Sequence, residues 1–179
     1  MAITNVDQFR DNFKGVRSNR YIITAIGPPD GVGTLPADEF TLYAKATSFP
    51  GSAIGMIPVS YQGRIIKFSG ERSFAEWAIQ VYDSSSDANA LREHFEKWIN
   101  AMDHHSTHVM NYNLCAAHWD IEYDQQKTGT TTTGSNYQKK MKMHKVWPVD
   151  ISPIDLSYES VDSFAEFTLT LAYDHHEIL

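Results

Sequence analysis

The chain has 179 residues, one cysteine, eight histidines and a formal net charge of −7. A chain of this length can bury a core of its own, and a single cysteine, Cys115, excludes an intramolecular disulfide. The acidic balance argues against tight binding of polyphosphates, and no apolar run approaches the ~20 residues that a membrane-spanning helix needs.

The first predicted element is a short amphipathic helix over residues 4–14. Its apolar residues Val6, Phe9 and Phe13 recur at helical spacing, and Gly15 follows as a C-cap. The same segment has neither the basic nor the apolar region of a secretory signal. We therefore expect assembly in a reducing cytoplasm.

Two strands are predicted next, on either side of a loop. Residues 20–27 (RYIITAIG) are rich in β-branched and aromatic side chains, and the loop GPPDGVG then ends the strand without phosphate-binding spacing. Residues 39–47 (EFTLYAKAT) alternate in polarity, which predicts a half-buried strand. Its apolar face would carry Phe40, Leu42, Ala44 and Ala46, and its polar face Glu39, Thr41, Tyr43, Lys45 and Thr47.

Residues 49–70 (FPGSAIGMIPVSYQGRIIKFSG) crowd large apolar side chains among four glycines. Gln62 and Gly63 separate two strand-like runs, which predicts a hairpin with a tight turn. Such a hairpin is either buried in the domain or left apolar for another copy of the chain to cover. Residues 73–83 (SFAEWAIQVYD) predict the next strand, with an inward face of Ala75, Trp77, Ile79 and Val81.

One strong helix is predicted over about 86–103. It follows a run of serines that offer N-caps, and its polar face includes Arg92, Glu93, Glu96 and Lys97. A stripe at helical spacing is expected to pack on the strands, and its members are Ala88, Leu91, Phe95, Trp98, Ile99 and Met102.

Three later strands complete the predicted fold. Residues 115–124 and 136–149 flank a threonine- and glycine-rich tip, and the lysines of KKMKMHK would form one solvated face of the second strand. Residues 164–174 (FAEFTLTLAYD) alternate cleanly. The sequence predicts a single mainly β domain over 1–179, an antiparallel β-sandwich or small barrel with one flanking helix.

Candidate chemical groups are few. His104 and His108 have a possible metal spacing, but they follow the last apolar position of the helix, and polar histidines at such places are usually solvated. The run 174–176 and His144 receive the same interpretation, and Cys115 is expected to be a small buried residue. We predict no catalytic residue, no cofactor and no metal ligand; a histidine-based metalloenzyme is the alternative of a different class.

The order of several short motifs resembles that of the inner tail tube protein of contractile-tailed bacteriophages, from about residue 20 onward. The motifs are KAT-x-x-P at 45–50, IPV at 57–59, Gly70-Glu71-Arg72-Ser73-Phe74 followed by Trp77, and Trp147-Pro148 before the closing strand. The chain departs from the family pattern in a longer GPPDGVGTLP loop and a longer threonine-rich tip at 125–136.

The resemblance implies a structural protein of the virion, in which hexameric rings stack into a tube inside a sheath and the genome passes through without specific binding. The implied partners are other copies of the chain, the sheath, a tube initiator at the baseplate and a tail terminator. A tube subunit of a phage-derived injection machine or of a type VI-like secretion system, or a tube-initiating paralogue, is the alternative. Assembly in the host cytoplasm, away from any membrane, is expected.

Two sets of site residues follow from combining the resemblance with the residue patterns. The stretch 48–70 should leave the body of the subunit, so that neighbouring copies cover part of it. The expected interface residues are Phe49, Pro50, Ile54, Met56 and Pro58. The polar faces of two strands are candidates for the wall of the lumen, and the expected residues are Glu39, Thr41, Lys45, Glu76 and Gln80.

Overall fold

The computed structural model describes residues 6–7, 9, 16–26, 37–83, 91–104, 109–110, 119–127, 137–158, 161 and 163–179. The predicted helix over 4–14 lies mostly outside these residues. The loop after residue 26, most of the threonine-rich tip, His108 and Cys115 also lie outside them.

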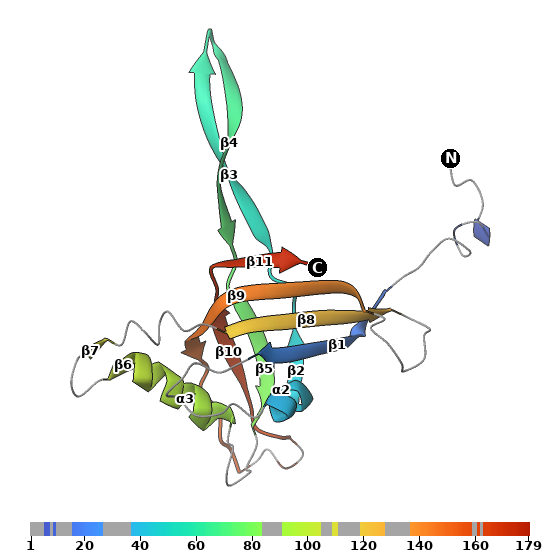
Figure 1. The fold of residues 1–179 in the computed structure, drawn as a ribbon, viewed down its shortest axis with the longest axis vertical. Helices are drawn as coiled ribbons and strands as arrows, with labels where there is room; N and C mark the ends of the chain where they lie inside the picture. Colours follow the sequence, from blue (N-terminus) through green and yellow to red (C-terminus); the bar gives the residue numbers. More distant parts are fainter. Residues whose placement is uncertain are drawn as a thin grey trace.

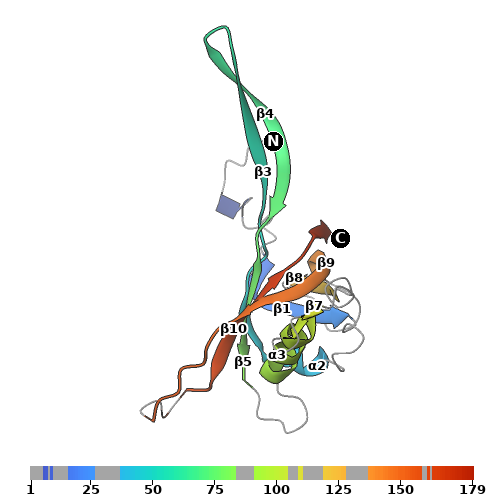
Figure 2. The ribbon, with the colours of Figure 1, turned by 90° about the vertical axis from the view of Figure 1, so that its left-hand side faces the viewer.

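The described part of the chain is dominated by antiparallel strands, with two helices on one side (Figures 1 and 2). The main sheet has the order β1-β8-β9-β10-β5-β2, and β11 pairs with β9 beside this path. Its strands are β1 (Val16–Ile26), β2 (Ala44–Thr47), β5 (Trp77–Tyr82), β8 (Trp119–Lys127), β9 (Tyr137–Ile151), β10 (Glu166–Ala172) and β11 (His175–Ile178). A separate hairpin contains β3 (Ser52–Tyr61) and β4 (Arg64–Phe74), and a short pair contains β6 (Asp103–His104) and β7 (Val109–Met110).

Strand β9 connects the two layers of the fold because different parts of it pair with different strands. Its first part pairs with β8 and β11, while residues 147–151 pair with β10. Lys145 lies between these parts with a φ of 56°, a left-handed conformation that breaks the regular strand. The mainly β sandwich predicted from the sequence is confirmed.

The core lies between the inner face of the strands and the two helices. Alternation along β5 and β10 buries Trp77, Ile79 and Val81 on one strand and Phe167, Leu169 and Leu171 on the other, as predicted, while Ala75 is exposed. From α3 (Leu91–Met102), Leu91, Phe95 and Trp98 are buried, which confirms the predicted packing stripe in this described part of the helix.

The strand predicted over 39–47 is wrong in its first half. Residues 37–43 form the helix α2 (Ala37–Tyr43), and only Ala44–Thr47 are a strand. The expected apolar face is accordingly divided, because Phe40 is fully buried whereas Leu42 is 75% exposed. Alternation over so few residues does not separate a strand from one or two helical turns, and Asp38 and Glu39 suit the positive end of a helix. Phe40 packs edge-to-face on Phe95, with ring centroids 5.8 Å apart.

Candidate assembly surface

The β3–β4 hairpin projects away from the sandwich along the longest axis of the molecule (Figures 1 and 2). All ten residues of β3 are exposed, and so is β4 except at Gly70 and Phe74. At the turn, Gln62 and Gly63 have φ angles of 47° and 75°. Two consecutive left-handed residues match the twist of a tight two-residue hairpin, which confirms the predicted turn.

The hairpin is apolar although solvent surrounds it. Eight of its large hydrophobic side chains are between 43% and 66% exposed. They are Ile54, Met56, Ile57, Val59, Tyr61, Ile65, Ile66 and Phe68. Contiguous apolar surface of this kind on a lone chain marks an interaction site or an aggregation hazard. The first alternative weighed for this stretch, a hairpin buried within its own domain, is therefore wrong.

The strand register divides the hairpin into two unequal faces. Ile57 lies opposite Phe68 and Val59 lies opposite Ile66. Directly opposed residues point to the same side of a ladder, so these four side chains and Tyr61 form one face, hereafter the apolar face, with Arg64 opposite Tyr61 at its end by the turn.

The other side, hereafter the mixed face, pairs Met56 with Ser69, Pro58 with Lys67 and Ser60 with Ile65. Sequence reasoning selected Met56 and Pro58 and missed the more apolar face. The Gln62-Gly63 turn already fixes this register, so counting outward from it would have found the apolar face.

The base of the hairpin is covered within the chain itself. Phe49 packs against the core, so the expectation that only neighbouring copies cover it is wrong. Pro50 is buried within the chain, and its place at a subunit interface stays a prediction. On β4, Phe74 contacts the ring of His176 at 4.9 Å and lies under the guanidinium of Arg72 at 4.8 Å. The hairpin is therefore held firmly at its base and uncovered beyond it.

Two glycines permit a close approach of the strands near the base. A Cβ atom on Gly70 would lie 3.1 Å from the carbonyl carbon and 3.2 Å from the carbonyl oxygen of Gly55. Backbone atoms cannot rotate away as a side chain can, so a larger residue at position 70 would force the strands apart. The register of β3 and β4 shifts at this point, between Ile54 and Met56.

A second exposed apolar segment precedes β10, at the end of the molecule opposite the hairpin (Figures 1 and 2). Four of its described apolar side chains are at least 84% exposed, whereas Ile154 is partly buried against the core; the four are Leu156, Tyr158, Val161 and Phe164. Arg92 of α3 donates a hydrogen bond of 2.8 Å to the carbonyl oxygen of Ser152, which fixes the start of the segment. This stretch, hereafter the 152–165 segment, was not singled out from the sequence.

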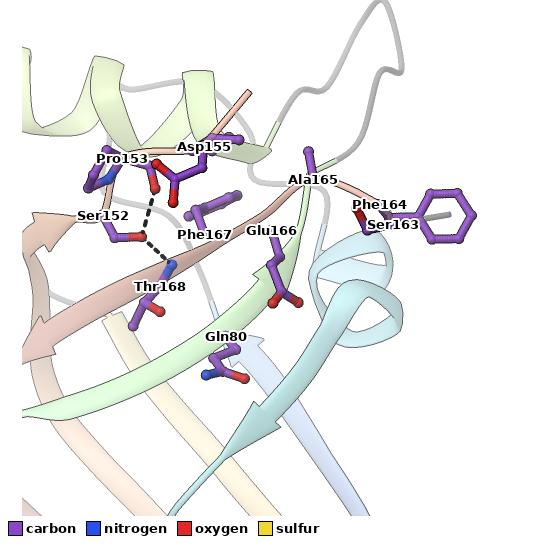
Figure 3. A pocket seen from close by; sticks show the side chains of 11 residues that line it. Gln80, Ser152, Pro153, Asp155, Ser163, Phe164, Ala165, Glu166, Phe167 and Thr168 are labelled. Atoms are coloured by element: carbon purple, nitrogen blue, oxygen red, sulfur yellow. Dashed lines mark hydrogen bonds between the residues drawn. The ribbon is translucent and has the colours of Figure 1, made fainter. Parts of the chain in front are cut away.

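A pocket of about 390 Å³ lies between the 152–165 segment and the outer side of β5 and β10 (Figure 3). Ser152 closes one side by accepting a hydrogen bond from the Thr168 backbone N–H at 2.8 Å. Asp155, Glu166 and Gln80 contribute polar groups to the lining, whereas Phe164 points away from the pocket.

The residues expected on a lumen wall do not form one surface. Lys45 and Gln80 lie on the neighbouring strands β2 and β5, but Glu39 and Thr41 lie on α2, where the Thr41 hydroxyl donates to the carbonyl oxygen of Ile23 at 2.6 Å. Glu76 is exposed in the connection between β4 and β5. The interpretation of Glu39 and Thr41 as part of a polar strand face is wrong, because the helix removes them from the sheet.

Lys45 is neutralised by a partner that sequence reasoning did not find. Its ammonium group pairs with the carboxylate of Glu166 on β10 and lies 5.3 Å from the ring centre of Tyr82. The hydrogen bond to Glu166 raises the pKa of Lys45 above its ordinary value. The positive charge at Lys45 is therefore balanced within the polar face.

Histidines of the described residues divide between surface and interior. His104 is exposed on β6, whereas His94 is buried on α3, where burial and the nearby Lys97 lower its pKa. His144, His175 and Glu177 come together, with one potential ligand atom from each within 4.8 Å of the others. Sequence reasoning missed this cluster because the pairing of β9 with β11 creates it. No described helix is long and apolar enough to cross a membrane.

The fold is shared with chains of contractile injection systems. A chain of the anti-feeding prophage baseplate aligns with a TM-score of 0.67 at 10% identity, covering 93% of this chain and 97% of its own length. A chain of the PVC sheath-tube complex in the extended state aligns with a TM-score of 0.64 at 12% identity, covering 98% of each chain. These likenesses show that the fold is shared over nearly the whole length of each chain.

The chain belongs to the phage tail tube protein family, whose model matches residues 15–179. It is 25% identical to tail tube protein gp19 of Enterobacteria phage T4 over 144 residues, 78% of this chain and 82% of that protein. It is 23% identical to the tail tube protein of Serratia phage KSP90 over 159 residues, 88% and 85% of the two chains. The protein is a structural component of a contractile phage tail and not an enzyme.

Proposed function

We propose that six copies of the chain form a ring and that rings stack into a tube through which the genome leaves the capsid. The observation that carries this proposal is the apolar, solvent-exposed β3–β4 hairpin. A neighbouring copy is the natural cover for such a surface, since a standard interface buries about 800 Å² on each partner. Sixfold assembly is supported by the sixfold-symmetrised baseplate in which the structural neighbour occurs.

The surface that receives the hairpin is, in this proposal, the 152–165 segment and its flanks on the next copy. The hairpin from 52 to 74 is basic, with Arg64, Lys67 and Arg72 against Glu71. Residues 150–166 contain no basic residue and five acidic ones, of which only Glu166 is described as paired, with Lys45; the five are Asp150, Asp155, Glu159, Asp162 and Glu166. Opposite charge steers association and fixes orientation, while apolar residues on both surfaces supply the burial.

The two surfaces lie at opposite ends of the molecule, so their contact is head-to-tail (Figure 1). A head-to-tail contact uses two different patches, and it either closes into a ring or continues as an open stack of copies. Where it joins one ring to the next, it continues until another protein caps the stack. That property fits stacked rings, with an initiator at the baseplate and a terminator at the far end.

The lumen wall, in this proposal, includes the outer side of β2, β5 and β10. Gln80 is exposed there, Thr168 and Thr170 are half-buried, and Lys45 is neutralised by Glu166. A hydrated polar wall in an acidic protein repels DNA mildly and forms no ion pairs that would slow its passage. Gln80→Lys should slow genome ejection from assembled virions, whereas Glu93→Lys on the outer face of α3 should not; equal ejection rates would exclude this wall.

The remaining partners are proposed from the same family membership. A sheath surrounds the tube, and assembly takes place in the host cytoplasm. The alternative is the tube of a protein-injecting machine, which the structural neighbours from injection systems favour. Genes for a capsid and a terminase next to this gene support the phage tail, and their absence from a complete gene cluster supports the injection machine.

The central experiment introduces a charge on one face of the hairpin at a time. Ile57→Asp with Ile66→Asp places two carboxylates on the apolar face, and Ser60→Asp is the matched control on the mixed face. We expect the double variant to remain folded but to form no tubes in negative-stain electron microscopy and sedimentation, while the control assembles. Normal tubes from the double variant would refute the hairpin assignment, and a double variant that is unfolded would mean that the hairpin is part of the core.

A further inference from the structure

His144, His175 and Glu177 lie on one side of the ladder between β9 and β11. His175 is directly opposite His144, and Glu177 is two residues further along β11. Residues two apart on a strand point to the same side, and directly opposed residues of a ladder do so too. The backbone register therefore places all three side chains together, whatever their rotamers.

The distances within this group are short. His144 Nε2 lies 3.6 Å from Glu177 Oε2, and the rings of His144 and His175 stack with centroids 4.6 Å apart. One potential ligand atom from each residue lies within 4.8 Å of the other two. His176, between the two β11 residues, is buried on the opposite side against Phe74.

We propose that these three residues bind one divalent zinc-type cation. Two imidazole nitrogens and one carboxylate oxygen form a common zinc ligand set, with the fourth position left to water. Bonds of about 2.0–2.2 Å place tetrahedral ligand atoms ~3.4 Å apart, close to the spacing between His144 and Glu177. His175 must rotate its ring to bring a nitrogen closer to the other two ligand atoms, and its exposed position allows this.

The backbone around the site is already fixed. The Asp174 N–H donates to the carbonyl oxygen of His144 at 3.1 Å, and the Leu179 N–H donates to that of Lys140 at 2.9 Å. These bonds hold both ends of β11 on β9, so binding requires side-chain rotation and no rearrangement of the strands. Pre-organised ligands of this kind lose little freedom when a cation binds.

Two lysines set the charge around the site. Lys145 is paired with Asp174 at 3.5 Å, so its charge is largely balanced. Lys142 lies directly opposite Glu177 and therefore on the same side as the three ligands. Its positively charged ammonium group repels a divalent cation at this site, so Lys142→Gln should strengthen binding of the cation. A cation bound elsewhere in the chain would not show this effect.

The cation would act as a structural clamp. It would cross-link β11 to β9 on the outer side, while His176 on the inner side of β11 contacts Phe74 at the base of the hairpin. Occupancy would thus fix the joint between the hairpin and the sandwich. This inference does not depend on how copies of the chain assemble.

The test is calorimetric titration of the chelator-treated full chain with zinc sulfate, together with thermal unfolding with and without zinc. We expect one ion per chain and a higher Tm with zinc. Affinity should fall at least about tenfold in His175→Ala and in Glu177→Gln, and should be unchanged in His104→Ala, the exposed histidine of β6. Both ligand variants alter exposed side chains, and an unchanged Tm without zinc will confirm that they fold.

Two results would overturn the proposal. One is the absence of zinc binding to the wild-type chain in the calorimeter. The other is zinc binding that persists at full strength in both His175→Ala and Glu177→Gln, which would place the ion elsewhere in the chain. Stronger binding by Lys142→Gln, together with loss in the two ligand variants, would establish the site.

Discussion

The β3–β4 hairpin and the β5–β10 pair are both antiparallel ladders rich in alternating apolar residues, yet only one is buried. On β5 and β10 the inward side chains are at most 2% exposed, whereas Ile57 and Ile66 of the hairpin are 53% and 44% exposed. The outward positions of β5 and β10 are small or polar, such as Gln80, Thr168 and Thr170. The hairpin has Met56, Pro58 and Ile65 on its second face.

The difference shows how one chain can both fold alone and associate. A ladder with one apolar face needs a single cover, and its inward residues share one buried cluster with Phe95 and Trp98 of α3. The β3–β4 ladder is apolar on one face and mixed on the other, and no other part of the described fold packs on either face beyond the base of the hairpin. Changes in the β5–β10 region should therefore alter folding, and changes in the hairpin should alter assembly.

The largest expected effect is on folding, from a substitution on the buried face of helix α3. Trp98→Ala removes a fully buried ring that stacks on Phe95, with centroids 6.3 Å apart. We expect the free energy of unfolding to fall by about 3–5 kcal/mol, which chemical denaturation monitored by circular dichroism would measure. A loss below about 1 kcal/mol would contradict the assignment of α3 as the essential cover of the sheet.

The next effect separates assembly from folding within the hairpin. Gly70→Ala places a Cβ atom about 3.1 Å from the backbone of Gly55, and Gly51→Ala is the matched control because nothing lies within 4 Å of its Cβ position. Overpacking of this kind costs about 1–3 kcal/mol, so we expect the concentration needed for assembly to rise at least about fivefold in Gly70→Ala only. Sedimentation across a dilution series would measure this concentration. Equal concentrations for the two variants would show that the close approach of Gly55 and Gly70 does not matter for assembly.

The sequence predicts both of these ladders correctly, and the predictions that are wrong have physical causes. The period of two along 73–83 and 164–174 reports burial of one face, and it located β5 and β10 correctly. The same alternation misassigned 39–43, where a helix of seven residues mimics it. The apolar residues of the hairpin led to the prediction that neighbouring copies cover it. Its division into two faces could have been predicted as well, by counting the register outward from the Gln62-Gly63 turn.

The candidate sites show the same division between local and long-range information. Turn chemistry at Gln62 and Gly63 is local, so the hairpin was predicted correctly. The pairing of Lys45 with Glu166 joins residues 121 positions apart, and that of His144 with His175 depends on which strands are neighbours. No local pattern encodes such pairings, so sequence reasoning could not find them.

A third prediction concerns the pH dependence of folding stability, because the core contains a buried histidine and the hairpin contains none. Residues 52–74 contain no histidine, whereas His94 is buried on α3 with a pKa lowered below its ordinary value of 6.5. The pKa of His94 is lower in the folded chain than in the unfolded chain, so the unfolded chain binds a proton first as the pH falls. The folded chain therefore loses stability as the pH falls through 6.5. The loss ends once the pH is below the folded-state pKa, because both states are then protonated.

We therefore expect the free energy of unfolding to decrease between pH 7 and pH 5.5, as measured by urea denaturation in a series of buffers. His94→Gln removes one titrating group and should reduce the slope of this part of the profile. A slope from His176 remains, because burial lowers the pKa of that histidine too. An identical pH profile in the variant would assign the pH dependence to other groups.

The smallest expected effect comes from a surface pair on the same helix. Lys97 and Glu93 are one turn apart with Nζ and Oε1 at 2.9 Å, and both side chains are more than 60% exposed. Water and salt screen such pairs, so Lys97→Ala should cost at most about 0.5 kcal/mol, and added salt should reduce even that difference. A denaturation series at low and high salt would detect it. A cost above about 1 kcal/mol would mean that the outer face of α3 makes a further contact. We would then have to revise the view that α3 only covers the core and that only the hairpin binds neighbouring copies.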